Sequence, residues 1–373
     1  MVYLDYAATC PKVKYPCSNY GSFFNVNANY AYKEKRLLTE AENRVKRAIG
    51  AKSGKVIFGG TSSQLIENLM TAVNDIVHWF HWGDNQYTTL GSYVEHDSFN
   101  RYIGYKCTDV ENLDEWLSYY DDVQTFVMWQ GVNNLTGEIM PTEEIGKLCH
   151  EHDAFYICDM TAMIGKSPIP ANIDQWCDCA VWSGHKLGTE LGIGCCWISD
   201  RLDKWLDGFK LHGTPNLAGA LAMTQAVEDA CNSKALEDRN NHWLDLFWKM
   251  VEGLQKEHIH GEVYNGTLNE DKSNANESAE TTCAINAIRL PGFNADALQQ
   301  FLASKQVYIS IGGSACAEKH DYRVLNAYGL SNDEASEVIR VSFGEDSSVE
   351  DVVELVEGIK NFKELYVNEP YKR

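Results

Sequence analysis

The chain has 373 residues, 44% of them hydrophobic and 23% charged, and these ordinary proportions exclude a disordered or fibrous protein. Its 53 aspartates and glutamates outnumber its 32 lysines and arginines, and a net charge of −21 argues against binding to nucleic acid. The 12 cysteines are scattered rather than grouped into a short framework, so we expect a protein from a reducing, cytoplasmic compartment.

In chain order, the N-terminus lacks the basic start and apolar run of a signal peptide, and no later stretch predicts a membrane span. Apolar residues at helical spacing predict an amphipathic helix over residues 32–49, which Gly50 ends. A strand over 55–58 then leads through a Gly-Gly-Thr-Ser-Ser-Gln turn into a second helix. Short β-rich runs follow at residues 125–129, 154–158, 179–182 and 194–198. This alternation predicts an α/β fold with a mostly parallel sheet.

The pattern changes after about residue 215, where a long helical stretch begins. It leads to a polar segment, 265–281, which we interpret as an exposed loop. Two further β-rich runs and a final helix follow, at residues 307–310, 338–343 and 349–365. We therefore predict a second, smaller α+β domain. The expected large domain covers residues 13–228, and the expected small domain combines residues 1–12 with 229–373.

The segment Ser-Gly-His-Lys at residues 183–186 follows directly after a predicted strand. A lysine at the end of a buried strand is costly because its charge must be desolvated. Desolvation lowers the pKa of a lysine amine and makes it a nucleophile suited to Schiff-base formation. The tetrapeptide alone is equally consistent with an ordinary surface lysine at position 186.

Asp159 ends another predicted strand, 27 residues before Lys186. In open α/β sheets, ligands bind at the carboxyl ends of the strands. A pyridoxal-phosphate site requires a carboxylate beside the pyridinium nitrogen of the cofactor. A single aspartate in this place is more often a helix cap, so the prediction depends on the pair of Asp159 and Lys186.

The turn that begins the second helix contains Ser62 and Ser63. Backbone N–H groups at a helix N-terminus, together with small hydroxyl residues, form an anion site. We expect Ser62 and Ser63 to bind a phosphate, although a plain capping turn has the same pattern. The segment is not a P-loop, because no Gly-Lys-Ser/Thr sequence follows.

Together these segments resemble the cysteine desulfurase family, which belongs to the class V, fold-type I pyridoxal-phosphate enzymes. The matching segments occur in family order, at residues 3–9, 58–64, 94–96, 132–137, 159, 183–186, 213–216, 313–316 and 339–344. The resemblance implies a large, mostly parallel domain of the seven-stranded type, a smaller α+β domain, bound pyridoxal 5'-phosphate and a homodimer with shared active sites.

The resemblance also implies cofactor-binding roles. Lys186 would hold the cofactor covalently and move protons at the substrate carbons. His96 would stack on the pyridine ring and assist proton transfer, and Asp159 would pair with the ring nitrogen. The phosphate would be bound by four residues of this chain and one of the neighbouring subunit, namely Ser62, Ser63, Ser183 and His185, with Thr214 reaching across.

For the substrate, L-cysteine or a related amino acid, the resemblance implies that Arg340 binds the carboxylate and that Asn134 lies near it or near the ring hydroxyl. Cys316 would take the sulfur as a persulfide, release alanine and pass the sulfur to an acceptor protein, as in iron–sulfur cluster assembly. A cysteine thiol must be a thiolate for this attack. Judged by residue type alone, Cys316 would be a small buried hydrophobe.

The chain departs from the family pattern at Ala162, where the family carries a glutamine, at Tyr6, where it carries an asparagine, and in lacking a glycine-rich segment before residue 213. Two alternatives therefore stay open. The first is a class V aminotransferase or another carbon–sulfur or carbon–selenium lyase, such as a selenocysteine lyase, with Cys316 incidental. The second is a degenerate relative that only binds a partner. The Cys-Asp-Cys at 177–179 lacks a second ligand set, and we expect no metal site.

Overall fold

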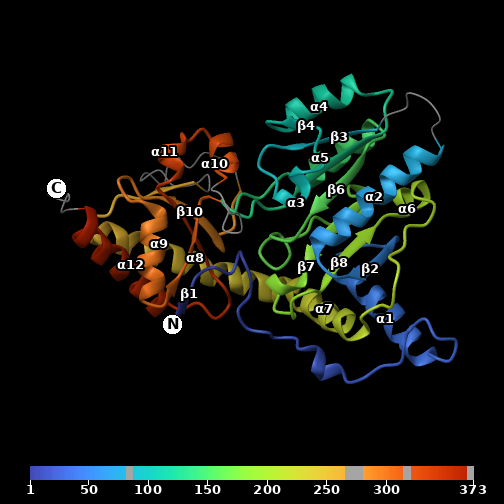
Figure 1. Ribbon diagram of the computed structural model, residues 1–373, viewed down its shortest axis with the longest axis horizontal. Helices are drawn as coiled ribbons and strands as arrows, with labels where there is room; N and C mark the ends of the chain where they lie inside the picture. The colour runs from blue at the N-terminus through green and yellow to red at the C-terminus, as the bar shows by residue number, and fades with distance from the viewer. Residues whose placement is uncertain (81–86, 265–279, 314–320, 368–373) are drawn as a thin grey trace. The chain divides into compact units, whose positions relative to one another are not determined.

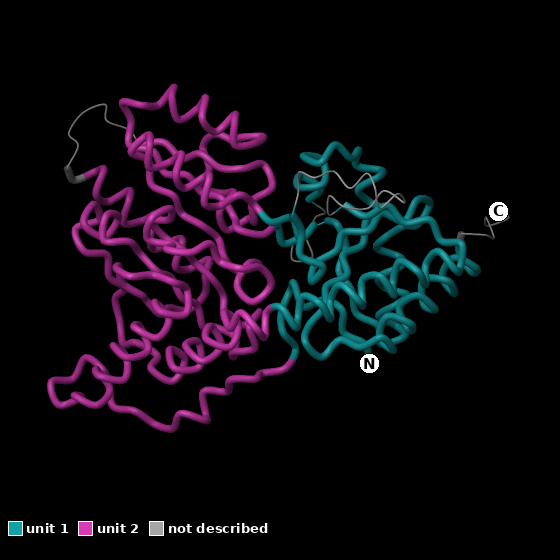
Figure 2. Tube along the Cα trace, turned by 180° about the vertical axis from the view of Figure 1, so that it is seen from behind, with its two compact units in different colours: residues 1–11, 133–139, 237–373 teal, residues 12–132, 140–236 magenta. Residues whose placement is uncertain are grey.

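The computed structural model describes residues 1–80, 87–264, 280–313 and 321–367 (Figure 1). The chain forms two compact units (Figure 2). Unit 1 comprises residues 1–11, 133–139 and 237–373, and unit 2 comprises residues 12–132 and 140–236. The short segment 133–139 thus belongs to unit 1, although the chain on both sides of it belongs to unit 2. The domain boundaries expected from the sequence concern folding domains and stay a prediction.

Unit 2 contains a seven-stranded sheet with the strand order β2-β8-β7-β6-β5-β3-β4. These strands are β2 (Lys55–Gly59), β8 (Gly194–Ile198), β7 (Cys179–Ser183), β6 (Phe155–Asp159), β5 (Thr125–Gln130), β3 (Thr88–Ser92) and β4 (Tyr105–Cys107). Only β8 runs in the direction opposite to the other six strands of this sheet. The predicted α/β fold with a mostly parallel sheet is therefore confirmed. The sequence pattern missed β3 and β4.

The helices of unit 2 cover both faces of this sheet, as expected for strands whose residues are all buried. They are α1 (Tyr32–Ala48), α2 (Ser62–Phe80), α3 (Asp97–Asn100), α4 (Val110–Tyr119), α5 (Thr142–Glu151), α6 (Asp200–Trp205) and α7 (Leu217–Ala230). One face packs against α2, whose apolar stripe supplies Leu65, Ile66, Leu69, Met70 and Val73. Each such side chain contributes about 1.5–3 kcal/mol by leaving water.

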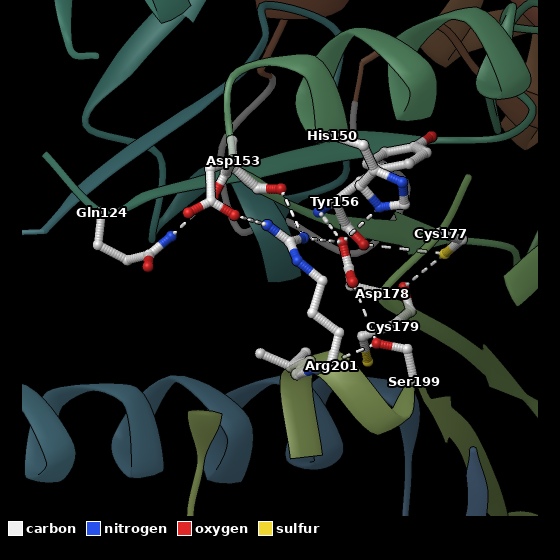
Figure 3. Close-up of polar contacts among 11 residues, drawn as sticks. Gln124, His150, Asp153, Tyr156, Cys177, Asp178, Cys179, Ser199 and Arg201 are labelled. Carbon is white, nitrogen blue, oxygen red and sulfur yellow. Dashed lines mark hydrogen bonds and ion pairs between the residues drawn. The ribbon is translucent and has the colours of Figure 1, made fainter. Parts of the chain in front are cut away.

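A polar network lies at the edge of the unit 2 sheet where β6 and β7 begin (Figure 3). At its centre is Asp178, whose side chain is 1% exposed. Its carboxylate accepts hydrogen bonds from the Tyr156 backbone N–H at 3.0 Å, the Ser199 hydroxyl at 3.0 Å and the Arg201 guanidinium at 3.1 Å. It also lies 3.0 Å from Nε2 of His150. These contacts satisfy a charge that would otherwise be costly to bury.

Arg201 connects this network to the loop before β6. Its guanidinium donates to the Ala154 carbonyl at 2.9 Å and to the Asp153 carboxylate at 2.7 Å. The guanidinium also stacks on the Phe155 ring, 4.2 Å from the ring centroid. One arginine therefore ties three consecutive residues to Asp178 at the start of the central strand.

Unit 1 contains a four-stranded antiparallel sheet with the order β12-β13-β10-β9 and a separate parallel pair. The four strands are β12 (Ser310–Ile311), β13 (Val338–Ser342), β10 (Ile285–Arg289) and β9 (Glu262–Val263). The parallel pair is β1 (Val2–Tyr3) with β11 (Val307–Tyr308). The first residues of the chain are therefore held by residues from its last third.

The helices of unit 1 are α8 (Ser233–Lys256), which begins in unit 2, α9 (Ala295–Ser304), α10 (Arg323–Ala327), α11 (Asn332–Ala335) and α12 (Val349–Phe362), which continues as a π-helical turn, Lys363–Val367. Capping boxes formed by Ser331 with Glu334 and by Ser348 with Asp351 begin α11 and α12. The loop expected at 265–281 lies mostly outside the described residues. No helix in the described ranges is both long enough and apolar enough to span a membrane.

Candidate active site

The turn between β2 and α2 brings two predicted phosphate-binding residues together. Ser62 begins α2 and is buried, and its hydroxyl lies 2.7 Å from the hydroxyl of Ser183 at the end of β7. The Ser62 backbone N–H also donates to the Ser183 hydroxyl, at 3.3 Å. Gly194 of β8 permits this approach, because a Cβ there would lie 2.6 Å from the carbonyl carbon of Thr61. The turn after β2, the end of β7 and the start of β8 therefore meet at one edge of the sheet.

Ser63 follows in the first turn of α2 and is exposed. The first four N–H groups of a helix have no partner within the helix, and the helix dipole makes this end positive. Thr61 satisfies one of these donors, because its hydroxyl accepts from the Gln64 N–H at 3.1 Å. The remaining donors and the serine hydroxyls suit an anion of the size of a phosphate group.

Lys186 and His185 lie in a single 3-10 turn, Gly184–Lys186, directly after β7. Hydrogen bonds from the Leu187 and Thr189 N–H groups to the Gly184 carbonyl fix this turn. Both side chains are half-buried. Burial, and then the neighbouring charge of Lys186, lower the pKa of His185 from 6.5 to about 4. The His185 imidazole is therefore neutral at pH 7 and can donate one hydrogen bond and accept another.

Asp159 is the last residue of β6 and is 7% exposed. Its Oδ1 accepts a hydrogen bond from the Thr161 N–H at 2.8 Å, so it does cap the turn that follows the strand. Within the described parts of the chain, this carboxylate has no ion-pair partner. It can therefore pair with a cationic ring nitrogen of a ligand.

Thr161 is a candidate that the sequence pattern did not single out. Its hydroxyl is buried and has no hydrogen-bond partner among the described residues. A buried hydroxyl without a partner is unusual, and it marks a place where a ligand can donate or accept. Thr161 stands beside Ala162, the position at which the family carries a glutamine. In the sequence, the only signal for Thr161 was that this hydroxyl residue directly precedes Ala162, where the family's polar glutamine is missing.

His96 caps the short helix α3 and is exposed. Its Nδ1 accepts from the Ser98 N–H at 3.2 Å and lies 2.9 Å from the Ser98 hydroxyl. Because Nδ1 acts as an acceptor, we assign the proton of the neutral ring to Nε2. Ser98 thus restricts the orientation of the His96 ring.

The two predicted substrate residues lie in unit 1, where they contact each other. Arg340, in β13, is 6% exposed, and its Nη1 donates to the backbone carbonyl of Asn134 at 3.0 Å. Its Nη2 donates to the carboxylate of Asp5 at 2.7 Å. Asp5 lies in the N-terminal motif, but nothing local in the sequence pairs it with a residue 335 positions away.

Thr214 is exposed and lies in the segment before α7. It lines a cavity of about 660 Å³ within unit 2, together with Gly59, Gly60 and Gln64 from the start of α2 and its approach. Lys210 also lines this cavity. Thr214 and residues of the predicted phosphate turn therefore line the same cavity of unit 2. Cys316, the predicted sulfur carrier, lies outside the described residues.

Comparison with known proteins gives a family and a fold. The family model for aminotransferase class-V matches residues 2–355. A mitosomal cysteine desulfurase of Trachipleistophora hominis is 26% identical over 92% of this chain and 81% of that protein. The cysteine desulfurase IscS of Mannheimia succiniciproducens is 25% identical over 96% of this chain and 92% of that protein.

Two solved structures share the fold. A NifS-like protein superposes with a TM-score of 0.78 at 19% identity, covering 98% of this chain and all of that chain. The apo structure of a cysteine desulfurase from Thermococcus onnurineus gives a TM-score of 0.71 at 19% identity, covering 97% of this chain and 94% of the other. The fold-type I architecture expected from the sequence is therefore confirmed.

Proposed function

The chain belongs to the class-V aminotransferase family, and from that premise we propose that it is a cysteine desulfurase that converts L-cysteine to L-alanine. The relatives that align over nearly the whole chain are named cysteine desulfurases. The observation that carries the proposal furthest is the meeting of the Ser62 and Ser183 hydroxyls at the N-terminus of α2. It supports an anion site at the carboxyl edge of the sheet, the edge at which Asp159 ends β6 and Lys186 lies in the turn after β7.

Enzymes of this family use pyridoxal 5'-phosphate, and the residues at this edge fit that group. The serine hydroxyls and the helix terminus suit its phosphate, and Asp159 suits its ring nitrogen. The hydroxyl of Thr161, buried and without a partner among the described residues, supports a further polar contact at the same edge. When bound, the cofactor supplies an electron-withdrawing ring that stabilises negative charge on the substrate carbon.

Each proposed residue then has a separate task. Ser62, Ser63, Ser183 and His185 would bind the phosphate, and Asp159 would keep the ring nitrogen protonated. His96 would stack on the ring and assist proton transfer, and Lys186 would anchor the cofactor and move protons between the substrate carbons. In unit 1, Arg340 binds the substrate carboxylate, because a planar guanidinium matches a carboxylate with two parallel hydrogen bonds. Asn134 lies beside Arg340 and contributes to the same contact.

Sulfur transfer is assigned to Cys316. Its thiolate forms a bond to the sulfur of L-cysteine while the carbon–sulfur bond of the substrate breaks. The electron pair of the broken bond stays on the substrate carbon, which takes up the proton that the substrate's own thiol gives up through Lys186, so the products are L-alanine and a persulfide on Cys316. An acceptor protein then receives the outer sulfur, for example for iron–sulfur cluster assembly in the cytoplasm. We further propose that the enzyme is a homodimer in which Thr214 reaches the phosphate of the neighbouring subunit.

The decisive experiment measures L-alanine and sulfide from L-cysteine in the presence of a reductant. The Cys316→Ala variant should lose sulfide release while it keeps the cofactor. Cys283→Ala is the matched control, because Cys283 lies among the described residues of unit 1, where burial raises the pKa of its thiol to about 11. Full desulfurase activity in Cys316→Ala would rule out the persulfide mechanism.

A substrate panel separates this function from other chemistry of the same family. Ala162, in place of a glutamine, is the observation that favours testing the alternatives. Selenocysteine and a set of ordinary amino acids should be compared with L-cysteine. Faster turnover of selenocysteine, or amino-group transfer to a keto acid, would identify a selenocysteine lyase or an aminotransferase and leave Cys316 without a catalytic role.

A further inference from the structure

The N-terminal segment of unit 1 is attached to β13, the strand that carries Arg340. Asp5 forms a parallel bridge with Ser342, and the Ser342 N–H donates to the Leu4 carbonyl at 2.8 Å. The Ser342 hydroxyl accepts from the Ala7 N–H at 2.9 Å. Because alternate residues of a strand share a face, Ser342 and Arg340 lie on the same side of β13. The backbone of Asp5 is therefore fixed close to the Arg340 side chain.

Asp5 and Arg340 form a mostly buried ion pair. Their side chains are 18% and 7% exposed, and Oδ1 of Asp5 lies 2.7 Å from Nη2 of Arg340. Nη1 donates to the Asn134 carbonyl at 3.0 Å. A guanidinium has five N–H donors in one plane, so these two contacts leave three, including Nε, which has no partner within the described residues. Asp5 therefore anchors the group without using up its donors.

The second anchor is itself rigid. Segment 133–139 forms a tight turn in which Oδ1 of Asn133 accepts from the N–H groups of Leu135 and Thr136, at 2.8 Å and 3.0 Å. Gly137 has a φ of +79°, and a Cβ there would lie 2.3 Å from the Ile285 carbonyl oxygen. This turn holds the Asn134 carbonyl in place. Both partners of Arg340 are thus fixed by backbone contacts, so the plane of the guanidinium is set in advance.

We propose that Asp5 is a positioning residue for substrate binding. It holds the Arg340 guanidinium in the orientation in which its remaining N–H groups receive the α-carboxylate of the amino-acid substrate. An arginine side chain has many rotamers, and fixing one before binding reduces the ordering that the substrate must impose. This inference rests on the proposed role of Arg340. It adds Asp5 as a residue that affects the affinity for the substrate carboxylate through its position and not through its charge.

Two substitutions separate position from charge. Asp5→Asn keeps an acceptor oxygen at the same reach and removes the charge, whereas Asp5→Glu keeps the charge and moves it by one methylene. Calorimetric titration of the holoenzyme with L-alanine, and with ethylamine as the ligand without a carboxylate, measures the contact. We expect Asp5→Glu to bind L-alanine about tenfold more weakly and Asp5→Asn to stay within about threefold of wild type. Ethylamine binding should not change in either variant.

Kinetics supply a second readout. In Asp5→Glu, the KM for L-cysteine should rise while kcat stays within about twofold of wild type, because only the carboxylate contact is altered. Glu337→Asp is the matched control: it likewise moves a carboxylate by one methylene, the one that accepts from Arg289 Nε in unit 1 at 2.8 Å, and it should leave L-alanine binding unchanged.

Three outcomes would overturn the inference. The first is wild-type affinity for L-alanine in Asp5→Glu. The second is tighter L-alanine binding in Asp5→Asn, which would mean that Asp5 only neutralises the charge of Arg340. The third is an equal loss of affinity for L-alanine and ethylamine, which would make Asp5 a general structural residue. The proposed desulfurase function is tested separately. If wild type forms no alanine from L-cysteine but Asp5→Glu still weakens L-alanine binding, the function fails and the positioning role stands.

Discussion

Where β6 and β7 begin, the unit 2 sheet surrounds Asp178 with hydrogen-bond donors, whereas where β6 ends, Asp159 has no ion-pair partner among the described residues. Both carboxylates are buried. The protein itself supplies hydrogen-bond partners around Asp178, whereas Asp159 has no ion-pair partner among the described residues. The difference shows how a single sheet separates tasks. The amino edge is complete on its own, and the carboxyl edge leaves polar groups for a ligand to satisfy.

Lys186 provides the largest test of this contrast. Lys186→Ala should lower turnover of L-cysteine by about 10³-fold, because it removes both the proposed anchor of the cofactor and the group proposed to move protons. Its side chain is half-buried on a short turn, so the melting temperature of the apoprotein should hardly change. Visible absorbance of the purified protein and steady-state rates give the result. Retained absorbance with normal turnover would remove Lys186 from the site.

Asp178→Ala should lower the stability of the protein and leave its turnover almost unchanged, the reverse of the effect expected for Lys186→Ala. It leaves the Tyr156 N–H, the Ser199 hydroxyl and the Arg201 guanidinium without their acceptor, and we expect a loss of about 3 kcal/mol in the free energy of unfolding. Chemical denaturation measures this loss, and kcat of the folded fraction at 25 °C should stay near wild type. A variant that is stable but inactive would contradict the separation of tasks between the two edges.

Asp159→Asn sharpens the same comparison at the carboxyl edge. The amide oxygen can still accept from the Thr161 N–H, so the turn and the stability should be preserved. Loss of the negative charge should lower kcat on the order of 10²-fold, because the ring nitrogen of the cofactor is then no longer kept protonated. Parallel denaturation and rate measurements distinguish the two effects. A destabilisation as large as that of Asp178→Ala would make Asp159 a structural residue.

The smallest effect concerns pH. The folded protein holds the pKa of His185 at about 4, against 6.5 for an ordinary histidine, mainly through burial. Between these values the unfolded chain binds a proton on this imidazole that the folded protein does not, so stability falls as the pH drops from about 6.5 to about 4. Melting temperatures across this range should fall less steeply in His185→Asn. The exposed His212 gives the control, since His212→Asn should keep the wild-type slope.

The carboxyl edge was largely predictable from the sequence, because each of its residues follows a strand with a strong apolar pattern. Ser62, Asp159 and Lys186 follow such runs, and the strands themselves were confirmed. Strand β3, Thr-Thr-Leu-Gly-Ser, was missed because hydroxyl residues and a glycine hide its burial. The assignments of individual site residues stay predictions.

The amino edge and the substrate side left no comparable signal. Asp178 appeared in the sequence only as the middle of Cys-Asp-Cys, and its partners come from three other segments of the chain. Asp5 meets Arg340 across nearly the whole sequence, and segment 133–139 joins unit 1 with no change in composition. Such contacts depend on tertiary packing, which local patterns do not encode.

The place of β2 at the end of the strand order, next to β8 alone, has a consequence for biosynthesis. The strand that carries the proposed phosphate turn leaves the ribosome early, but its pairing partner, Gly194–Ile198, is made only after the other five strands of the sheet. At ordinary translation rates this takes roughly 10–40 s from the first codon. The nascent chain therefore has no finished cofactor site during that interval, and loading of the cofactor must follow the synthesis of β8.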